Sequence, residues 1–153
     1  MVIKFFFFIF LLLPFCTIAD TVCVAVKIAD GDSFSCRSKR RTISVRLEGI
    51  DAPEKGQAYS KQSRQALNKL IYKQKVTLKN TSKDKYGRTL ATVYSGSLNV
   101  NLTMIENGYA WHYKRYSNNK QYAAAQQHAQ QHRRGLWADK GRIIQPGDWR
   151  KKR

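Results

Sequence analysis

The sequence predicts an α+β fold in which a small five-stranded β-barrel packs against three helices. Three observations lead to this prediction. Five short segments alternate apolar and polar residues, as half-buried strands do; three segments have the apolar spacing of amphipathic helices; and helices follow the third and the fifth strand. We therefore expect one domain over residues 20–150, which is long enough for a hydrophobic core.

The first three strands are expected to follow one another directly. Residues 22–28 and 33–37 flank a glycine-containing turn, which predicts a pair of strands. Residues 43–48 then alternate apolar and polar side chains, and this pattern places Arg46 and Glu48 on the same polar face of a third strand. An ion pair between these two side chains is therefore one hypothesis for Arg46.

A helix over residues 58–72 is expected after the third strand. Pro53 biases the residue before it toward an extended backbone, and so ends the strand ahead of this helix. Residues 76–78 and 89–94 are expected to form the last two strands. This order of elements fits an oligonucleotide/oligosaccharide-binding fold, or OB-fold.

Two further helices are predicted in the second half of the chain. Residues 101–107, closed by Gly108, form a short one, and residues 120–134 form a longer one with Gly135 as its C-terminal stop. Residues 151–153 are all basic, and we expect them to be a solvated tail without a specific role.

The N-terminus has the pattern of a secretory signal peptide over residues 1–19. Lys4 precedes an apolar run at 5–13, and residues 17–19 form a small-residue cleavage site. A membrane anchor is the alternative, but the apolar stretch is shorter than the roughly 20 residues that a spanning helix needs, and Pro14 interrupts it. We expect a secreted or periplasmic chain that has no stable membrane association after cleavage.

The chain is strongly basic. It carries 28 Lys and Arg residues against 10 Asp and Glu, for a formal net charge of +18. Solubility alone would not require so large an excess, and a basic surface of this kind favours a polyanionic partner. Nucleic acid is the first candidate, and an anionic membrane or polysaccharide is the second.

Two cysteines remain after the signal peptide, Cys23 and Cys36. They lie on the first two predicted strands, on either side of the turn, and an exported chain folds in an oxidising compartment. A disulfide between Cys23 and Cys36 is therefore expected. The alternative is two small buried residues, because a sequence does not show whether the two Cα atoms come within bridging distance.

Half of the ten acidic residues fall within one short window of this basic chain: Asp30, Asp32, Glu48, Asp51 and Glu54. Crowded carboxylates raise one another's pKa and destabilise the fold, so a compensating cation is expected, and a hard metal ion suits carboxylate oxygens. An Asp-Gly-Asp sequence alone is more often a tight turn. Arginine within the window and the basic run at 85–88 add groups that bind phosphate, so the whole set predicts phosphodiester chemistry.

The same residues give the chain its resemblance to a known family. Motifs at residues 26–33, 46–54, 84–91, 101–110 and 134–137 occur in the order found in the staphylococcal nuclease, or thermonuclease, family, and they span nearly the whole mature chain. The chain resembles that family in several separate motifs at compatible distances. The resemblance implies a five-stranded OB-fold barrel with three helices, and a calcium-dependent nuclease that acts on DNA and RNA.

The resemblance also implies a Ca²⁺ site. Asp32, Asp51 and the main-chain carbonyl of Ala52 would bind Ca²⁺ directly, and Asp30 would reach it through water. Glu54 would orient or deprotonate the attacking water. These roles agree with the chemistry of carboxylate and carbonyl oxygens, which are the ligands that Ca²⁺ prefers.

The resemblance also implies contacts with the substrate. Arg46 and Arg88 would grip the scissile phosphate and offset the charge that builds on it. By the same resemblance, Lys85 and Tyr86 would contact a neighbouring phosphate. Stacking on a base is a hypothesis for Trp111 and Tyr113, with buried core aromatics as the alternative.

The leading hypothesis is thus a nuclease that cuts DNA and RNA with Ca²⁺ and leaves 3′-phosphate ends, and we expect it to be a monomer. The alternative from another class is a non-catalytic OB-fold module that binds nucleic acid. Such a module would be expected to have lost a metal-binding aspartate or an arginine, and none is lost from this sequence. A basic factor that coats anionic cell surfaces would leave the acidic window unexplained.

Overall fold

The computed structural model describes residues 20–138 and 144–152. The predicted signal peptide, residues 1–19, and the last residue of the predicted tail, Arg153, lie outside the described residues. In the part of the chain that is described, no helix combines the length and the apolar character needed to cross a bilayer.

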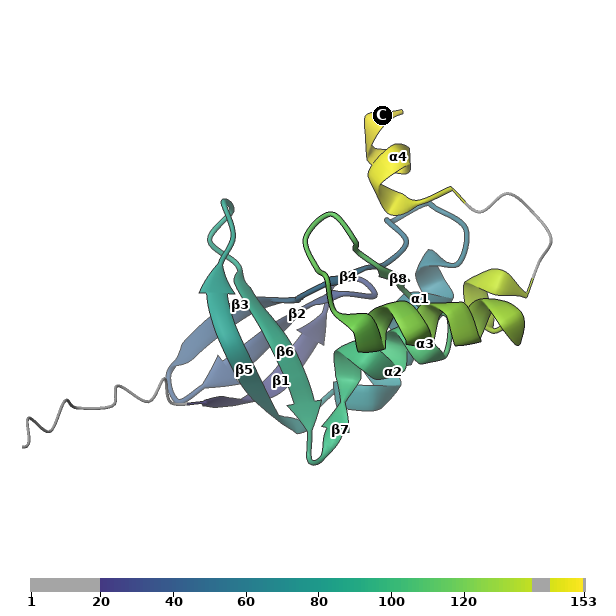
Figure 1. The fold of residues 1–153 in the computed structure, drawn as a ribbon. Coiled ribbons are helices and arrows are strands. Elements are labelled where there is room, and N and C mark those ends of the chain that lie inside the picture. Colours follow the sequence, from purple (N-terminus) through teal and green to yellow (C-terminus); the bar gives the residue numbers. More distant parts are fainter. Residues whose placement is uncertain (1–19, 139–143, 153) are drawn as a thin grey trace, which may run out of the picture.

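The centre of the fold is a closed β-barrel (Figure 1). Within the described residues it has five strands, in the hydrogen-bonded order β3-β2-β1-β5-β6, and a parallel pairing between β3 and β6 closes it. The barrel strands are β1 (Thr21–Ile28), β2 (Ser33–Ser38), β3 (Arg41–Leu47), β5 (Lys75–Lys83) and β6 (Thr89–Ser95). The α+β class and the barrel that the sequence predicts are confirmed.

Three short strands extend this barrel. β7 (Leu98–Asn99) pairs with the end of β6, and β4 (Ile50–Asp51) pairs with β8 (Trp111–His112) as a separate two-stranded sheet. The β4–β8 pair sets Asp51 opposite Trp111. Two residues far apart in the sequence are therefore brought to the same end of the molecule.

The helices lie beside the barrel in Figure 1. Within the described residues they are α1 (Ser60–Ile71), α2 (Val100–Glu106), α3 (Lys120–Gln131) and α4 (Pro146–Lys151), with a 3₁₀ turn η1 (Gly135–Trp137) after α3. The first three confirm the predicted helices to within a few residues at their ends. The fourth, α4, was not predicted, and it contains Lys151, the first residue of the predicted solvated tail.

The core is formed where the barrel meets α1 and α2. Leu67 and Ile71 of α1 and Met104 and Ile105 of α2 are buried, as the helical spacing of these apolar residues requires. On the barrel side the buried residues alternate along the strands, as in β3, where Val45 and Leu47 are buried. The exposed-to-buried alternation of β3 leaves Arg46 on the opposite face, and this residue enters the site described below.

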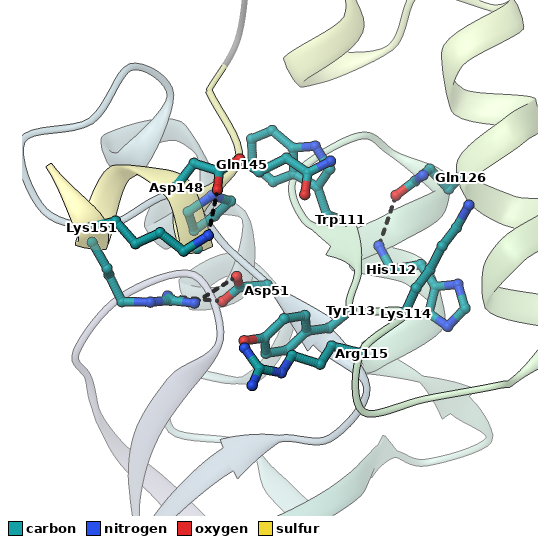
Figure 2. Close-up of a pocket in the computed structure, with 13 residues that line it drawn as sticks. Asp51, Trp111, His112, Tyr113, Lys114, Arg115, Gln126, Gln145, Asp148 and Lys151 are labelled. Carbon is teal, nitrogen blue, oxygen red and sulfur yellow. Dashed lines mark hydrogen bonds and ion pairs between the residues drawn. The ribbon is translucent and has the colours of Figure 1, made fainter.

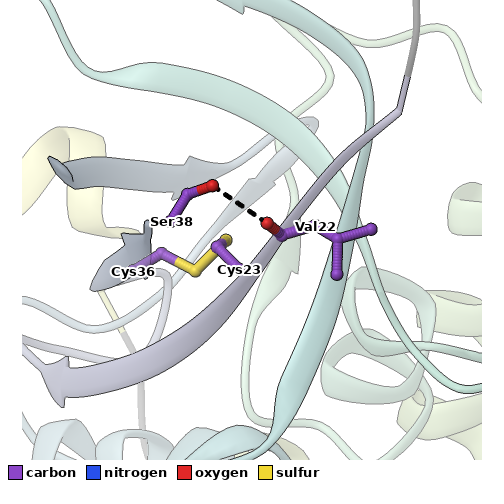
Figure 3. The surroundings of a disulfide bond; sticks show 4 residues. All are labelled: Val22, Cys23, Cys36 and Ser38. Carbon is purple, nitrogen blue, oxygen red and sulfur yellow. Dashed lines mark hydrogen bonds between the residues drawn. A yellow bond between two sulfur atoms is a disulfide. The ribbon is translucent and has the colours of Figure 1, made fainter. Parts of the chain in front are cut away.

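The predicted disulfide is present (Figure 3). Cys23 of β1 and Cys36 of β2 are bonded, with their Cα atoms 5.7 Å apart, and both residues are buried. The Ser38 hydroxyl donates a hydrogen bond to the Val22 carbonyl, 3.1 Å away, beside the bridge. The bond therefore ties together two strands that are already paired in the barrel.

The predicted helix stop at Gly135 is wrong. α3 ends at Gln131, and Arg133 has the positive φ of 51° that turns the chain away from the helix axis. Gly135 instead allows two backbones to meet, because a Cβ atom on it would lie only 2.4 Å from the Gly108 carbonyl oxygen. The two glycines therefore permit the close packing of the α3–η1 connection on the end of α2.

Candidate active site

Charged residues meet at one end of the barrel because the β1–β2 turn and the ends of β3 and β4 lie there. Asp32 lies in the β1–β2 turn, Arg46 near the end of β3, and Asp51 at the end of β4. The main chain fixes their spacing: the Leu47 amide donates to the Asp32 carbonyl at 2.8 Å, and the Ala52 amide donates to Asp32 Oδ2 at 2.8 Å. The sequence therefore brings these groups together through the backbone of the barrel itself.

Asp32 is almost fully buried, with 2% of its surface exposed. Its Oδ1 accepts hydrogen bonds from the Ser33 hydroxyl (2.8 Å) and from Arg46 Nη1 (2.6 Å). Burial raises the pKa of Asp32 to about 7; Arg46 opposes this rise, whereas the negative charges of Asp30 and Asp51 add to it. A nearby positive charge therefore stabilises the ionised form of this carboxyl group.

Arg46 bridges the two buried aspartates. Its Nη1 lies 2.6 Å from Asp32 Oδ1 and its Nη2 lies 2.9 Å from Asp51 Oδ1. Burial lowers the pKa of the guanidinium, but the two carboxylates outweigh burial and the pKa of Arg46 is raised. The hypothesis that Arg46 pairs with Glu48 is wrong, since Glu48 lies in the turn after β3 and the ion pairs of Arg46 go to the aspartates.

Asp51 and Glu54 share a second arginine. Arg150 of α4 approaches Asp51 with Nη2 3.0 Å from Oδ2 and Nη1 3.2 Å from Oδ1, and the same Nη1 lies 2.5 Å from Glu54 Oε1. The Glu54 amide donates a hydrogen bond to Gln57 Oε1 at 3.0 Å. The structure therefore brings Asp32, Arg46, Asp51 and Glu54 into one cluster of charged groups.

Arg150 was not identified from the sequence. It is 96 positions from Glu54 and 99 positions from Asp51, so no local pattern connects them. The signal that could have indicated α4 is Pro146 at the first turn of a short helix with Arg150 and Lys151 in its last turn. That signal would have predicted the helix but not its contact with the carboxylates.

Lys85, Tyr86 and Arg88 lie on a different feature, the hairpin between β5 and β6. Asp84 organises this turn: its Oδ1 accepts the amides of Tyr86 and Arg88, each at 2.9 Å, and its Oδ2 lies 2.7 Å from Arg88 Nε. Tyr86 is 72% exposed, and the Lys85 ammonium lies 5.0 Å from the centre of its ring. Arg88 is thus paired with Asp84 rather than with the carboxylate cluster.

The hairpin nevertheless begins beside the cluster. The parallel register of β3 and β6 pairs Arg46 with Leu90 and Val45 with Thr89, so Arg88 is the residue just before this paired stretch. Its side chain is 30% exposed. The two predicted phosphate-binding arginines therefore come from β3 and from the turn just before its neighbour β6, and Arg46 is the less exposed of the two.

A cavity of about 510 Å³ opens next to Asp51 (Figure 2). Tyr113 and Arg115 lie on one side of it in the figure, and α4, with Asp148 and Lys151, lies on the other. Trp111 also lines it, although only 5% of its surface is exposed and its ring contacts Trp137 edge-on at 5.7 Å. Trp111 is therefore a core aromatic with one edge at the cavity, whereas half-buried Tyr113 is more accessible.

The donor atoms at the cluster fit a hard cation. Among the described residues, no group of three or more His, Cys, Asp or Glu side chains is arranged to hold a metal ion. A cation here would therefore take two side-chain carboxylates, those of Asp32 and Asp51, with main-chain carbonyl and water oxygens as its other ligands. Burial of both aspartates within reach of each other's charge favours a positive neighbour, and in this structure Arg46 and Arg150 are those neighbours.

The comparisons with known proteins agree with the motifs. A family model described as "Staphylococcal nuclease homologue" matches residues 44–139. An "Uncharacterized endonuclease" of Haemophilus influenzae is 45% identical over 94% of this chain and 80% of its own length. A "Micrococcal nuclease" of Shigella flexneri is 37% identical over 82% of this chain and 78% of its own length.

A plant relative extends the comparison beyond bacteria. A "Probable staphylococcal-like nuclease" of Oryza sativa is 39% identical over 87% of this chain, which corresponds to 37% of that longer protein. The family model covers well over half of the chain, and the bacterial relatives match it over most of their length. The chain therefore belongs to the staphylococcal nuclease family and is a hydrolase of the nuclease class.

Proposed function

We propose that this protein is a secreted or periplasmic, Ca²⁺-dependent nuclease that hydrolyses phosphodiester bonds of DNA and RNA and leaves 3′-phosphate ends. The observation that carries the proposal is the cluster at the end of the barrel, where Arg46 bridges buried Asp32 and Asp51 and Glu54 lies alongside. Arg46 and Arg150 offset the charge of the buried aspartates in this structure. We propose that Ca²⁺ takes over part of this charge balance when substrate is bound, since carboxylate oxygens are the ligands that it prefers.

Asp32, Asp51 and the carbonyl of Ala52 would hold the Ca²⁺ ion. When bound, Ca²⁺ would supply positive charge beside the scissile phosphate. Asp32 is prepared for this role by its buried position and by the Ala52 amide, which fixes Oδ2 at 2.8 Å and so orients the carboxylate. Asp30 lies two residues before Asp32 in the β1–β2 turn. Its Oδ1 accepts a hydrogen bond from the Asp32 amide at 3.0 Å, which helps to fix the shape of this turn.

Glu54 would act on the attacking water. Its side chain is 34% exposed, so water can reach it, and its main chain is fixed by Gln57. In the reaction, the water oxygen forms a bond to phosphorus, Glu54 accepts the water proton, and the bond from phosphorus to the 5′ oxygen breaks. The phosphate then remains on the 3′ oxygen, and the 5′ oxygen takes up a proton from solvent.

The two arginines would stabilise the charge that builds on the phosphate. Arg46 is held by the barrel and has little freedom, with 14% of its side chain exposed. Arg88 is more exposed and would swing from Asp84 to a phosphate oxygen. Neither is suited to be a general acid, because a guanidinium does not release its proton at ordinary pH.

The hairpin and the cavity would extend the contact with substrate. Lys85 and Tyr86 lie at the exposed tip, where they would bind a phosphate next to the scissile one. Tyr113 borders the cavity beside Asp51 and would stack on a base, with Trp111 behind it. The Cys23–Cys36 disulfide supports an oxidising location for the mature chain, and we propose that it acts as a monomer.

A cleavage assay tests this function. The chain without residues 1–19 is incubated with plasmid DNA and with RNA, in Ca²⁺, in Mg²⁺ or in chelator, and the product ends are analysed. The proposal predicts cleavage of both substrates with Ca²⁺, none with chelator, and 3′-phosphate ends. Full cleavage in chelator would contradict the metal dependence, and a salt-sensitive shift of intact DNA would be the behaviour of the binding-only alternative.

A Glu54→Gln variant sharpens the assay. Turnover is expected to fall by about 10²–10⁴-fold while the affinity for substrate stays near that of the wild type, because the carboxylate acts mainly in the transition state. The control is Glu106→Gln, a change at the end of α2 and away from the cluster. Equal loss in both variants would contradict the role assigned to Glu54.

A further inference from the structure

The C-terminal segment Ile144–Lys152 is folded onto the acidic cluster. Gln57 donates a side-chain hydrogen bond to the Ile144 carbonyl, and Pro146 at the first turn of α4 is buried. Arg150 in the last turn then makes its ion pairs with Asp51 and Glu54. The segment is therefore attached at both of its ends to β4 and the loop that follows it.

Arg150 uses the oxygens that the proposed chemistry needs. Asp51 Oδ2 accepts from Arg150 at 3.0 Å, Asp51 Oδ1 accepts from both Arg46 and Arg150, and Glu54 Oε1 lies 2.5 Å from Arg150. A cation that binds Asp51 needs these same lone pairs, and the Glu54 oxygen that accepts from Arg150 is not open to an attacking water. With Arg150 docked, neither carboxylate is free for its proposed role.

Electrostatic repulsion opposes docking of Arg150 and binding of a cation at the same time. A divalent ion bound to Asp51 would lie within a few ångströms of a guanidinium that cannot lose its proton, so the two cations would repel each other across a partly buried site. Arg46 would face the same repulsion, but it projects from a barrel strand and its side chain is only 14% exposed. Arg150 sits on a six-residue helix and is 39% exposed, so it is the group that can leave.

We propose that the C-terminal segment is an autoinhibitory element: Arg150 occupies the carboxylates of Asp51 and Glu54, and binding of the divalent cation requires α4 to leave. This inference rests on the proposed function of those two residues. By linkage, whatever releases α4 strengthens cation binding by the same factor, and the cation weakens docking of α4 by that factor. Phosphates of a nucleic acid would favour release too, because α4 carries Arg150 and Lys151 to them.

Ca²⁺ binding without nucleic acid is the first test. Calorimetry compares the wild type with Arg150→Gln and with the matched control Lys152→Gln, which removes one positive charge from an exposed position in the same segment. The dissociation constant of Arg150→Gln is expected to be at least about 5-fold lower than that of the wild type, the lower end of usual coupling between sites. Lys152→Gln is expected to change it less than about 2-fold by comparison.

Hydrogen exchange gives the second readout. In the wild type without metal, the amides of Asp148, Trp149 and Lys152 are bonded within the segment, to Gln145 and Trp149 carbonyls. Deuterium uptake over residues 144–152 is expected to rise as Ca²⁺ is added, and to be high in Arg150→Gln even without Ca²⁺. A structural role for Arg150 alone would not make this uptake depend on Ca²⁺.

The outcomes separate the two claims. If the wild type and Arg150→Gln bind Ca²⁺ equally, and uptake in the segment ignores Ca²⁺, then α4 is not autoinhibitory, while the proposed nuclease function stands. If no variant binds Ca²⁺ and cleavage is unaffected by chelator, then the proposed metal site fails and the competition fails with it. Tighter binding in Arg150→Gln together with Ca²⁺-dependent uptake in the wild type is the result that the proposal predicts.

Discussion

The two groups of charged residues in this nuclease are built in opposite ways. The carboxylate cluster is buried at the end of the barrel, with its aspartates 2% and 3% exposed and its arginine held between them. The β5–β6 hairpin is open to solvent, with Tyr86 72% exposed and Arg88 held by a single nearby aspartate. The barrel therefore fixes the geometry of the cluster, whereas the hairpin offers cations that can move to the substrate.

Because of this difference in burial, we expect substitutions in the cluster and in the hairpin to affect stability to different degrees. We expect the buried bridge of Arg46 to matter for both stability and cleavage, because removing it leaves Asp32 without an ion-pair partner and Asp51 with Arg150 alone. A surface pair such as Asp84–Arg88 contributes little to folding. Arginines with the same proposed task on the phosphate should therefore respond differently when they are replaced.

The largest expected effect is at Arg46. Arg46→Gln is expected to lower the free energy of unfolding in metal-free buffer by about 3 kcal/mol, because Asp32 and Asp51 lose their shared cation. Cleavage is also expected to fall, by about 10²–10³-fold. Urea unfolding and initial cleavage rates measure the two effects. An unchanged unfolding midpoint would show that the bridge is not what holds the cluster together.

Arg88→Gln is the matched change on the hairpin. Cleavage is expected to fall by about 10²-fold, since a phosphate contact is lost, but the free energy of unfolding should change by less than about 1 kcal/mol. The same two measurements are used. A large loss of stability without a loss of cleavage would reverse the comparison between the two regions.

A smaller effect is expected at the tip of the hairpin. Lys85→Gln removes one phosphate contact, so DNA binding should weaken a few-fold and the slope of log affinity against log salt should become shallower by about 1. The control is Lys61→Gln on the exposed face of α1. Affinity measured between low and moderate salt checks this, and identical slopes in the two variants would contradict a specific role for Lys85.

The smallest effect concerns pH. Burial lowers the pKa of His112 from its ordinary 6.5, and Lys114 adds to this. The unfolded chain then binds more protons than the folded chain, so the stabilising contribution of His112 is present above pH 6.5 and is lost as the pH falls through the lowered pKa. His112→Gln should flatten the fall in stability between pH 7 and 5, whereas His128→Gln on the exposed face of α3 should not.

Much of the fold could be predicted because its signals are local. Alternation predicted β1, β2, β3 and β6 closely, and the Asp30–Asp32 turn and the strand through Arg46 identified the residues that form the cluster. The position of Glu48 was misjudged, because the alternation was extended one residue past the end of β3 at Leu47. The side-chain periodicity alone does not show where a strand stops.

The C-terminal helix could not be predicted in the same way. α4 has six residues, too few to display a helical repeat, and it is held by contacts with residues more than 80 positions earlier. The role of Gly135 does not follow from local sequence for a related reason, since its need for a small side chain comes from Gly108 across the fold rather than from the helix before it. Long-range contacts decided both of these features.

We propose that the buried cluster, and not the hairpin, forms the cation-dependent cutting site. The most direct test compares Asp51→Asn with Asp84→Asn, two aspartates that each pair with an arginine, in Ca²⁺-dependent cleavage of DNA. We predict that Asp51→Asn loses at least about 100-fold in rate and that added Ca²⁺ does not restore it, whereas Asp84→Asn stays within about 10-fold of the wild type. Equal rates in the two variants, or undiminished cleavage by Asp51→Asn, would contradict the account.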